Sequence, residues 1–136
     1  KDSKSVQTAV VQISKQIRNT MVPDWMGPYL IYNYGNTAFD IIANVNPEDL
    51  NLETITMAEL TYTIDHESVR TLLDFYERRT GRLYFEIESI IPTLDSISDI
   101  ARKKLGWSKD QEQDEIQLIR DTVVAQTTFV TELEPA

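Results

Sequence analysis

Apolar residues recur at steps of three and four along most of this chain, and the runs stop at glycine or proline. This spacing places apolar side chains on one face of an α-helix, which is the strongest constraint the sequence puts on its fold. The pattern predicts helices over residues 5–22, 36–45, 57–67, 71–79, 92–105 and 109–130. A short apolar segment over residues 29–34 ends at Gly35, so Tyr34 and Gly35 are expected to form a tight corner between two helices. We therefore expect an all-α fold, an irregular bundle of about six helices with little or no sheet.

The helix ends carry their own signals. A Ser or Thr followed three residues later by an acid or glutamine is a capping box, and the sequence has two, Thr71 with Asp74 and Ser108 with Gln111. Glycine is the residue best suited to the left-handed position after a helix, so we expect it to end helices at three places: Gly35, Gly81 and Gly106. Proline is tolerated in the first turn of a helix but cannot continue one. Pro92 is therefore expected in a first turn, and Pro23 is expected to end the first predicted helix.

Two stretches lack a clear period. Residues 46–56 (NPEDLNLETIT) read as a loop. Residues 82–91 (RLYFEIESII) alternate too loosely for a confident strand and are expected to form a loop with one extended turn. At 136 residues, the chain is expected to form one domain over residues 1–136.

The net negative charge of the chain limits which kinds of molecule it can bind. The chain has 13 basic and 22 acidic residues, a net charge of -9, which repels the phosphates of nucleic acids and of anionic lipids. It also lacks an apolar run near the ~20 residues of a membrane span. We expect no nucleic-acid binding and no membrane contact from this chain.

Few residues are available for catalysis. Cysteine is absent and His66 is the sole histidine, which leaves neither a thiolate site nor a multi-histidine metal site. The glycines are isolated, so no phosphate-binding loop is expected, and the acids at 110–115 suit a solvated first turn. His66, between Asp65 and Glu67, is either a general base or a hydrogen-bonding residue at a helix boundary, and the sequence favours the second.

Arg78 and Arg79 stand side by side at the predicted end of a helix. They meet the negative end of the helix dipole there. One of them can pair with an acid, for which the candidates are Glu59, Glu67 and Asp74. The other points about 100 degrees away and is left for a partner or an anion. The alternative is a purely internal ion pair.

Three stretches in this order resemble one family. They are YGNTAFDII, AELTYTIDHESVRTLLDFYERRTG and IARKKLGWSKDQEQDEIQLI, and together they are similar to the C-terminal helical domain of the FAD-dependent glycerol-3-phosphate dehydrogenases and alpha-glycerophosphate oxidases. The positions that match are Tyr34, Gly35, Ala58, Glu59, Tyr62, Glu67, Thr71, Asp74, Arg78, Arg79, Thr80, Leu105, Gly106 and Trp107. The resemblance spans residues from about 30 to 125, and residues 1–27 fit a lead-in helix or linker.

The resemblance implies a parent enzyme that oxidises sn-glycerol 3-phosphate to dihydroxyacetone phosphate and passes electrons through FAD to quinone or oxygen. It implies that the flavin domain lies outside this chain, so we expect no cofactor and no catalytic residue here. The matching positions are then structural. Glu59 or Glu67 is expected to form an ion pair with Arg78 or Arg79 inside the domain. These four residues, together with Tyr62 and Asp74, are expected either in such structural contacts or at the interface with the flavin domain. A cytoplasmic location is expected.

A second hypothesis comes from the predicted helices over 5–22 and 109–130. The second has apolar residues near a seven-residue repeat, which is typical of helices that pair. If such faces stay uncovered, the chain is a free-standing helical protein-interaction module that binds a partner or itself.

Overall fold

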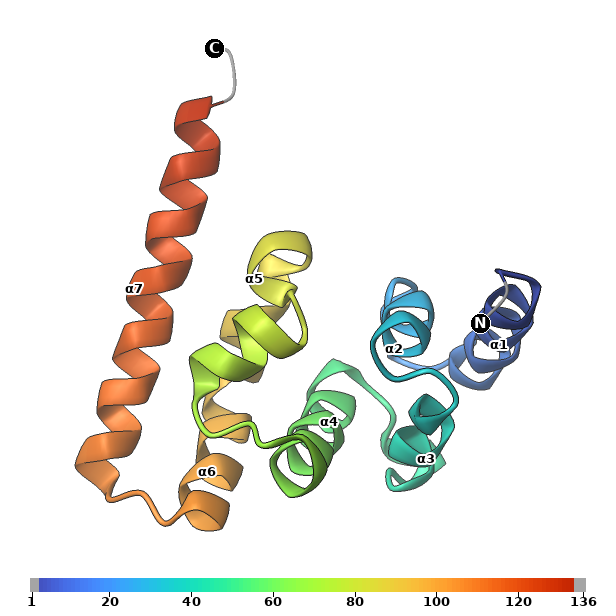
Figure 1. Cartoon of the computed structure of the whole chain (residues 1–136), viewed down its shortest axis with the longest axis horizontal. Coiled ribbons are helices and arrows are strands. Elements are labelled where there is room, and N and C mark those ends of the chain that lie inside the picture. Colours follow the sequence, from blue (N-terminus) through green and yellow to red (C-terminus); the bar gives the residue numbers. More distant parts are fainter. Residues whose placement is uncertain (1–2, 134–136) are drawn as a thin grey trace. The chain divides into compact units, whose positions relative to one another are not determined.

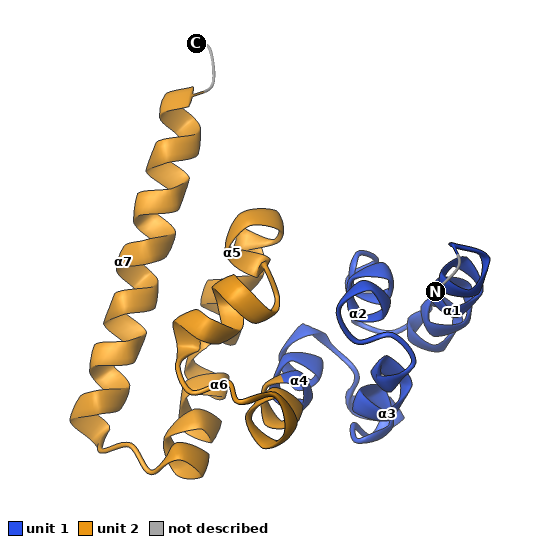
Figure 2. Ribbon diagram, viewed as in Figure 1, with its two compact units in different colours: residues 1–59 blue, residues 60–136 orange. Residues whose placement is uncertain are grey.

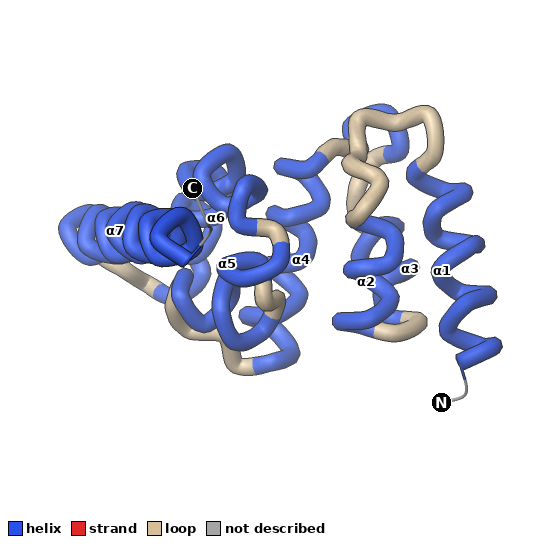
Figure 3. Tube along the Cα trace, turned by 90° about the horizontal axis from the view of Figure 1, so that it is seen from above, coloured by secondary structure: helices blue, strands red, loops and turns tan. Residues whose placement is uncertain are grey.

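The computed structural model describes residues 3–133 of the chain, which form helices joined by loops. Figure 3 distinguishes the helices from the loops that join them. Within the described residues there are seven α-helices, one π-helical segment, two short 3-10 helices and no strand; the only extended pairing found there is an isolated bridge between Met21 and Asn51. The prediction of an all-α bundle is confirmed.

The chain forms two compact units, residues 1–59 and residues 60–136 (Figure 2). The boundary falls inside helix α4, Leu52–Glu67, so one helix contributes to both units. The prediction of a single domain over residues 1–136 stays a prediction.

The first unit contains α1 (Ser3–Ile17), α2 (Met26–Tyr34), α3 (Thr37–Ala43), a 3-10 helix at Pro47–Asp49 and the start of α4 (Figure 1). Helices α1 and α2 pack closely, because Gly27 of α2 has no side chain to hold them apart. A β-carbon at Gly27 would lie 2.6 Å from the Ser14 hydroxyl oxygen of α1. The buried core of this unit includes Ile13, Ile17, Met26, Leu30, Ile41 and Ile55.

The first helix is shorter than the sequence predicts. It ends at Ile17 and not at residue 22, because Asn19 adopts a left-handed conformation with φ of 64° and turns the chain. The amide and the hydroxyl of Thr20 then both donate hydrogen bonds to the Ile17 carbonyl, which has no partner in the next turn of the helix. Met21, which the apolar spacing placed on the helix, is exposed.

Helix α4 begins five residues before the predicted start at Met57. Asn51 and Thr54 cap it reciprocally: the Thr54 amide donates to Asn51 Oδ1 at 2.8 Å, and the Asn51 amide donates to Thr54 Oγ1 at 3.0 Å. These two bonds satisfy amides that the first helical turn leaves unpaired. The expectation of a loop over residues 46–56 is therefore wrong from Leu52 onward.

The second unit contains the end of α4, a π-helical segment (Asp74–Arg79), α5 (Arg82–Phe85), a 3-10 helix (Ile87–Ser89), α6 (Ile90–Leu105) and α7 (Lys109–Leu133). Helix α6 packs against α7, and its inner face is fully or almost fully buried. That face consists of Ile90, Leu94, Ile97 and Ala101. It meets a core that also includes Phe75, Tyr76, Ile116 and Ile119.

In both predicted capping boxes, the hydroxyl of the Ser or Thr accepts a hydrogen bond from the backbone amide three residues later. The Asp74 amide donates to the Thr71 hydroxyl at 2.9 Å, and the Gln111 amide donates to the Ser108 hydroxyl at 3.1 Å. Gly81 and Gly106 have φ values of 68° and 73°, as expected for residues that follow a helix end. These local predictions are confirmed.

The expectation of a loop with an extended turn at residues 82–91 is wrong. Gly81, in its left-handed conformation, starts a new helical turn, and its carbonyl accepts from the amides of Tyr84 and Phe85 at 3.1 Å. Arg82 and Leu83 are buried while Tyr84 and Phe85 are exposed, a pairwise alternation that suits a helix and not a strand. The preceding segment also differs from an ordinary helix, because the Thr80 amide reaches the Phe75 carbonyl five residues back at 3.0 Å.

Candidate functional site

A buried carboxylate joins two helices in the first unit. Glu59 of α4 is fully buried, and its Oε2 accepts hydrogen bonds from the hydroxyls of Tyr29 and Tyr34, the latter at 2.6 Å. Tyr34 is the last residue of α2, and Gly35 after it has φ of 59° and turns the chain toward α3. Hydrogen bonds to a charged acceptor are stronger than neutral ones, so Glu59 fixes this corner to α4.

The two adjacent arginines lie in the second unit, at the end of the π-helical segment. Arg79 binds Glu67 with two hydrogen bonds, from Nε to Oε1 at 2.5 Å and from Nη2 to Oε2 at 3.1 Å. Arg78 points elsewhere, and its Nη2 lies 3.0 Å from Oδ1 of Asp74 in the preceding turn. The Arg78 side chain is 74% exposed and that of Arg79 24%, so the two arginines differ in their contact with solvent.

The structure pairs both arginines with predicted candidate acids, Arg79 with Glu67 and Arg78 with Asp74, whereas the sequence analysis expected one arginine to be left for a partner. Glu59, also a candidate for an arginine, binds tyrosines in its own unit. The Tyr62 ring packs on His66, with ring centroids 4.8 Å apart. A role of any of these residues in contact with a flavin domain stays a prediction.

Replacing Arg79 by alanine is expected to lower the free energy of unfolding by about 1 kcal/mol, because the bidentate pair with Glu67 is partly buried but still reached by water. Arg78→Ala is the matched control and is expected to cost less than about 0.5 kcal/mol, since its pair with Asp74 is exposed and local. Urea unfolding followed by circular dichroism measures both. If both variants lose the same free energy of unfolding, the Arg79–Glu67 pair stabilises the fold no more than the exposed Arg78–Asp74 pair.

Two positively charged side chains near the end of α6 lower the pKa of Asp99. Hydrogen bonds from Lys103 and Arg102 hold the pKa of the Asp99 carboxyl below its ordinary value of 3.8. A depressed pKa in the folded state stabilises the fold above the unfolded pKa, and this contribution is lost as the pH falls through the folded value. We expect the carbon-13 titration midpoint of Asp99 to lie below 3.8 and to rise in Lys103→Gln. An unchanged midpoint in that variant would contradict the assigned cause.

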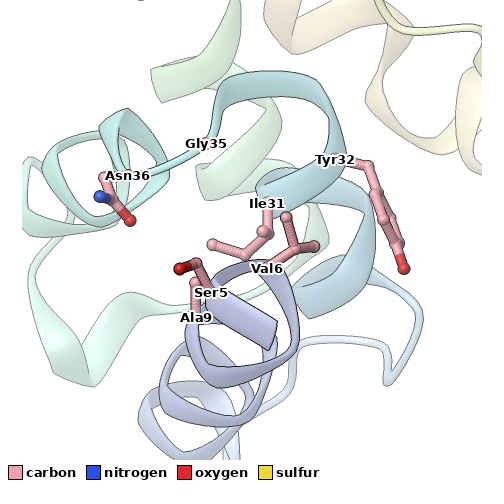
Figure 4. A pocket seen from close by; sticks show the side chains of 7 residues that line it. All are labelled: Ser5, Val6, Ala9, Ile31, Tyr32, Gly35 and Asn36. Carbon is pink, nitrogen blue, oxygen red and sulfur yellow. The ribbon is translucent and has the colours of Figure 1, made fainter. Parts of the chain in front are cut away.

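A partly open pocket of about 260 Å³ lies between α1 and the corner that joins α2 and α3 (Figure 4). Val6 and Ile31 are central to it, and Tyr32 and Asn36 lie on opposite sides. Ser5, Ala9 and Gly35 complete the lining. No carboxylate or histidine lines this pocket, so it has no base to activate the Ser5 hydroxyl. It can hold a small apolar group and has no arrangement for catalysis.

Arg82 is a residue that sequence reasoning missed. It is fully buried in α5, and its guanidinium carbon lies 5.9 Å from the centre of the Phe75 ring. Burial raises the pKa of Glu86 nearby, and the charge of Arg82 opposes that rise. The available signal was an arginine placed directly before three apolar residues, Leu83 to Phe85.

Tyr29 was missed as well, because its partner Glu59 is 30 residues away. Across residues 3–133 no group of three histidine, cysteine or acidic side chains is arranged to hold a metal ion. No helix in the same range is long and apolar enough to cross a membrane. Among the residues the sequence singled out, Glu59 and the Glu67–Arg79 pair link different helical elements. Tyr62 and the Asp74–Arg78 pair make contacts within one element.

Comparison with known families gives one match that covers most of the chain. Residues 5–112 match the family described as the C-terminal domain of alpha-glycerophosphate oxidase. The match includes Glu59, Tyr62, Glu67, Asp74, Arg78 and Arg79, and it stops near the start of α7. No solved structure matches the chain.

Several relatives carry the name aerobic glycerol-3-phosphate dehydrogenase. The protein of Staphylococcus saprophyticus is 25% identical over 107 residues, which are 76% of this chain and 19% of the relative. The protein of Bacillus subtilis is 31% identical over 78 residues, which are 54% of this chain and 14% of the relative. The protein of Staphylococcus aureus strain RF122 is 34% identical over 85 residues, which are 60% of this chain and 15% of the relative. The chain thus spans a fifth or less of the length of these relatives.

Proposed function

The chain belongs to the family of the C-terminal domain of alpha-glycerophosphate oxidase, and on that premise we propose that it is the accessory C-terminal domain of an enzyme that oxidises sn-glycerol 3-phosphate to dihydroxyacetone phosphate. The relatives named above support this reaction, because each is an aerobic glycerol-3-phosphate dehydrogenase. The chain matches only a small share of each relative, so substrate binding and catalysis belong to the rest of such a parent. The same proposal places it in the cytoplasm.

FAD is the cofactor that this family implies, and the residues of this chain do not fit it. The pockets along α1, of about 260, 370 and 610 Å³, are partly or widely open to solvent, whereas small-molecule sites bury most of the surface of their ligand. The four glycines are isolated, so no glycine-rich turn is available for a pyrophosphate. We propose that the flavin is held by the flavin domain of the parent, and that electrons pass from there to quinone or to oxygen.

The observation that carries the proposal is that the acids among the matching residues are already held by hydrogen bonds or an ion pair within the chain. Glu59 is buried under two tyrosine hydroxyls, and Glu67 is held by Arg79. Acids held in this way serve as structural links and are not available as an acid or base for a substrate. Arg78 has the most exposed side chain of the four ion-paired residues in the group, at 74%, and is the residue we propose for contact with the flavin domain.

The purified chain is expected to be inactive alone. Incubated with glycerol 3-phosphate, added FAD and a dye that accepts electrons, it should reduce no dye and should leave the fluorescence of free FAD unchanged. A parent enzyme of the family, assayed in parallel, is the positive control. Dye reduction that depends on the chain and on glycerol 3-phosphate would contradict the accessory role.

A further inference from the structure

The end of α7 carries an unusual concentration of exposed apolar side chains. We call residues 121–133 the distal segment of α7. Within it Val124 is 64% exposed, Phe129 55%, Val130 43% and Leu133 67%. Figure 1 shows this end of α7 extending past α6 within the second unit. The distal segment also lies outside the residues that match the family, which stop at 112.

Two of these side chains, Val130 and Leu133, continue an interface that already exists. Ile116 and Ile119 are buried where α7 packs on α6. Steps of three and four residues lead from them along the same face of the helix, and we call this row the α7 seam: Ile116, Ile119, Val123, Gln126, Val130 and Leu133. The first two members are covered, and the last two are open to water. Such a row is the pattern by which helices pair in coiled coils.

We propose that the distal segment of α7 pairs with the same segment of a second copy of this chain. Charge is the first reason for choosing that partner. The whole chain has a net charge of -9, but the distal segment carries only Asp121 and Glu132. The residues that flank the seam there, Thr122, Thr127 and Phe129, are uncharged. Two distal segments can therefore approach without the repulsion that acts between other parts of two acidic chains.

Gln126 is the second reason. It is the one polar member of the seam, in a position that coiled coils usually fill with an apolar residue. In a two-fold pair Gln126 meets Gln126 of the second copy, and each side-chain amide supplies both a donor and an acceptor. Against a purely apolar partner surface the same amide would be buried without hydrogen bonds, which is costly. The seam thus matches itself better than it matches an apolar surface.

The pairing is expected to be weak. Thirteen helical residues span about 20 Å, so the interface falls well below the area of standard protein complexes. We expect a monomer–dimer equilibrium with a dissociation constant of about 10⁻⁵ to 10⁻³ M. Sedimentation equilibrium of the 136-residue chain should show a mean mass that rises from one copy toward two as concentration increases through this range.

Two valines of the same segment give a matched test. Val130 lies on the seam, whereas Val124 is about 120 degrees around the helix from it and is more exposed. Val130→Glu is expected to weaken the dimer at least tenfold, and Val124→Glu to leave the dissociation constant within about twofold. Circular dichroism shows whether each variant keeps its helical content, so a loss of pairing can be told from a loss of folding.

A second measurement reports on contact directly. The chain has no cysteine, so a single one can be introduced without side reactions. Gln126→Cys, at the position where the pair brings the same residue of both copies together, should form a disulfide-linked dimer under mild oxidation, and Val124→Cys should form several-fold less. The proposal is overturned if the wild-type chain stays one copy in mass up to about 1 mM, the weakest dissociation constant expected, at which about half of the chains would be paired. It is equally overturned if the variants at 124 and 130 behave alike.

Discussion

Replacing Glu59 by alanine is expected to lower the free energy of unfolding by about 3 kcal/mol. The change removes the acceptor for the hydroxyls of Tyr29 and Tyr34 and leaves a cavity where a fully buried side chain was. Tyr34 is itself buried, so its hydroxyl has little access to water as a replacement. Urea unfolding of the whole chain, followed by far-ultraviolet circular dichroism, measures the loss.

Glu59→Gln is the control for this experiment. Its amide oxygen can still accept from a tyrosine hydroxyl, but it lacks the charge that strengthens both bonds. We expect a loss of about 1 kcal/mol, smaller than that of the alanine variant. Tyr34→Phe, which removes one donor and keeps the ring, should also cost about 1 to 2 kcal/mol. If Glu59→Ala costs less than Tyr34→Phe, the carboxylate does not hold the corner together.

Leu94→Ala is expected to have a similar effect in the second unit, a loss of about 3 kcal/mol. Leu94 lies on the buried face of α6, where truncation leaves a cavity surrounded by packed side chains. Ile91, three residues earlier on the same helix, is 43% exposed and provides the control. Ile91→Ala should cost less than about 1 kcal/mol, because little apolar surface is withdrawn from water there. Similar costs for both variants would contradict the burial of this face.

The two alanine variants also test the prediction of a single domain. Glu59 belongs to the first unit and Leu94 to the second. If the chain unfolds as one cooperative domain, each variant shifts the same transition. If the units unfold separately, each variant shifts only one of two transitions, and the prediction of one domain over residues 1–136 is wrong.

Local signals explain what could be predicted of the fold. The caps at Thr71 and Ser108 and the glycines at 81 and 106 act within a few residues, so their effects can be read from the sequence. The apolar period of α6 is equally local. These features suffice for the all-α class and for most helix positions.

The errors arise where one local hydrogen bond decides the outcome. Asn19 takes a left-handed conformation that asparagine tolerates but does not require, and this ends α1 before its apolar period does. Asn51 and Thr54 form a cap without the residue types of the usual capping box. Residues 82–91 were misread because α5 is a single turn, too short to display a helical period.

The candidate site was predictable in part. Glu67 and Arg79 lie only 12 residues apart, and the sequence named both as members of an ion pair. The partners of Glu59 are 25 and 30 residues away, on a helix whose packing against α4 no local pattern reveals. The burial of Arg82 depends on tertiary packing in the same way. Long-range contacts of this kind require the structure.

The central claim is that this chain serves as the accessory domain of a flavin enzyme, and co-expression tests it most directly. The chain and the flavin domain of its parent are produced as separate polypeptides, with only the flavin domain tagged, and an Arg78→Ala chain serves as the matched variant. We predict that the chain copurifies with the flavin domain, that glycerol 3-phosphate oxidation by that domain is higher with the chain than without it, and that Arg78→Ala copurifies less. A flavin domain that oxidises glycerol 3-phosphate at the same rate without the chain, and does not retain it, would contradict the account.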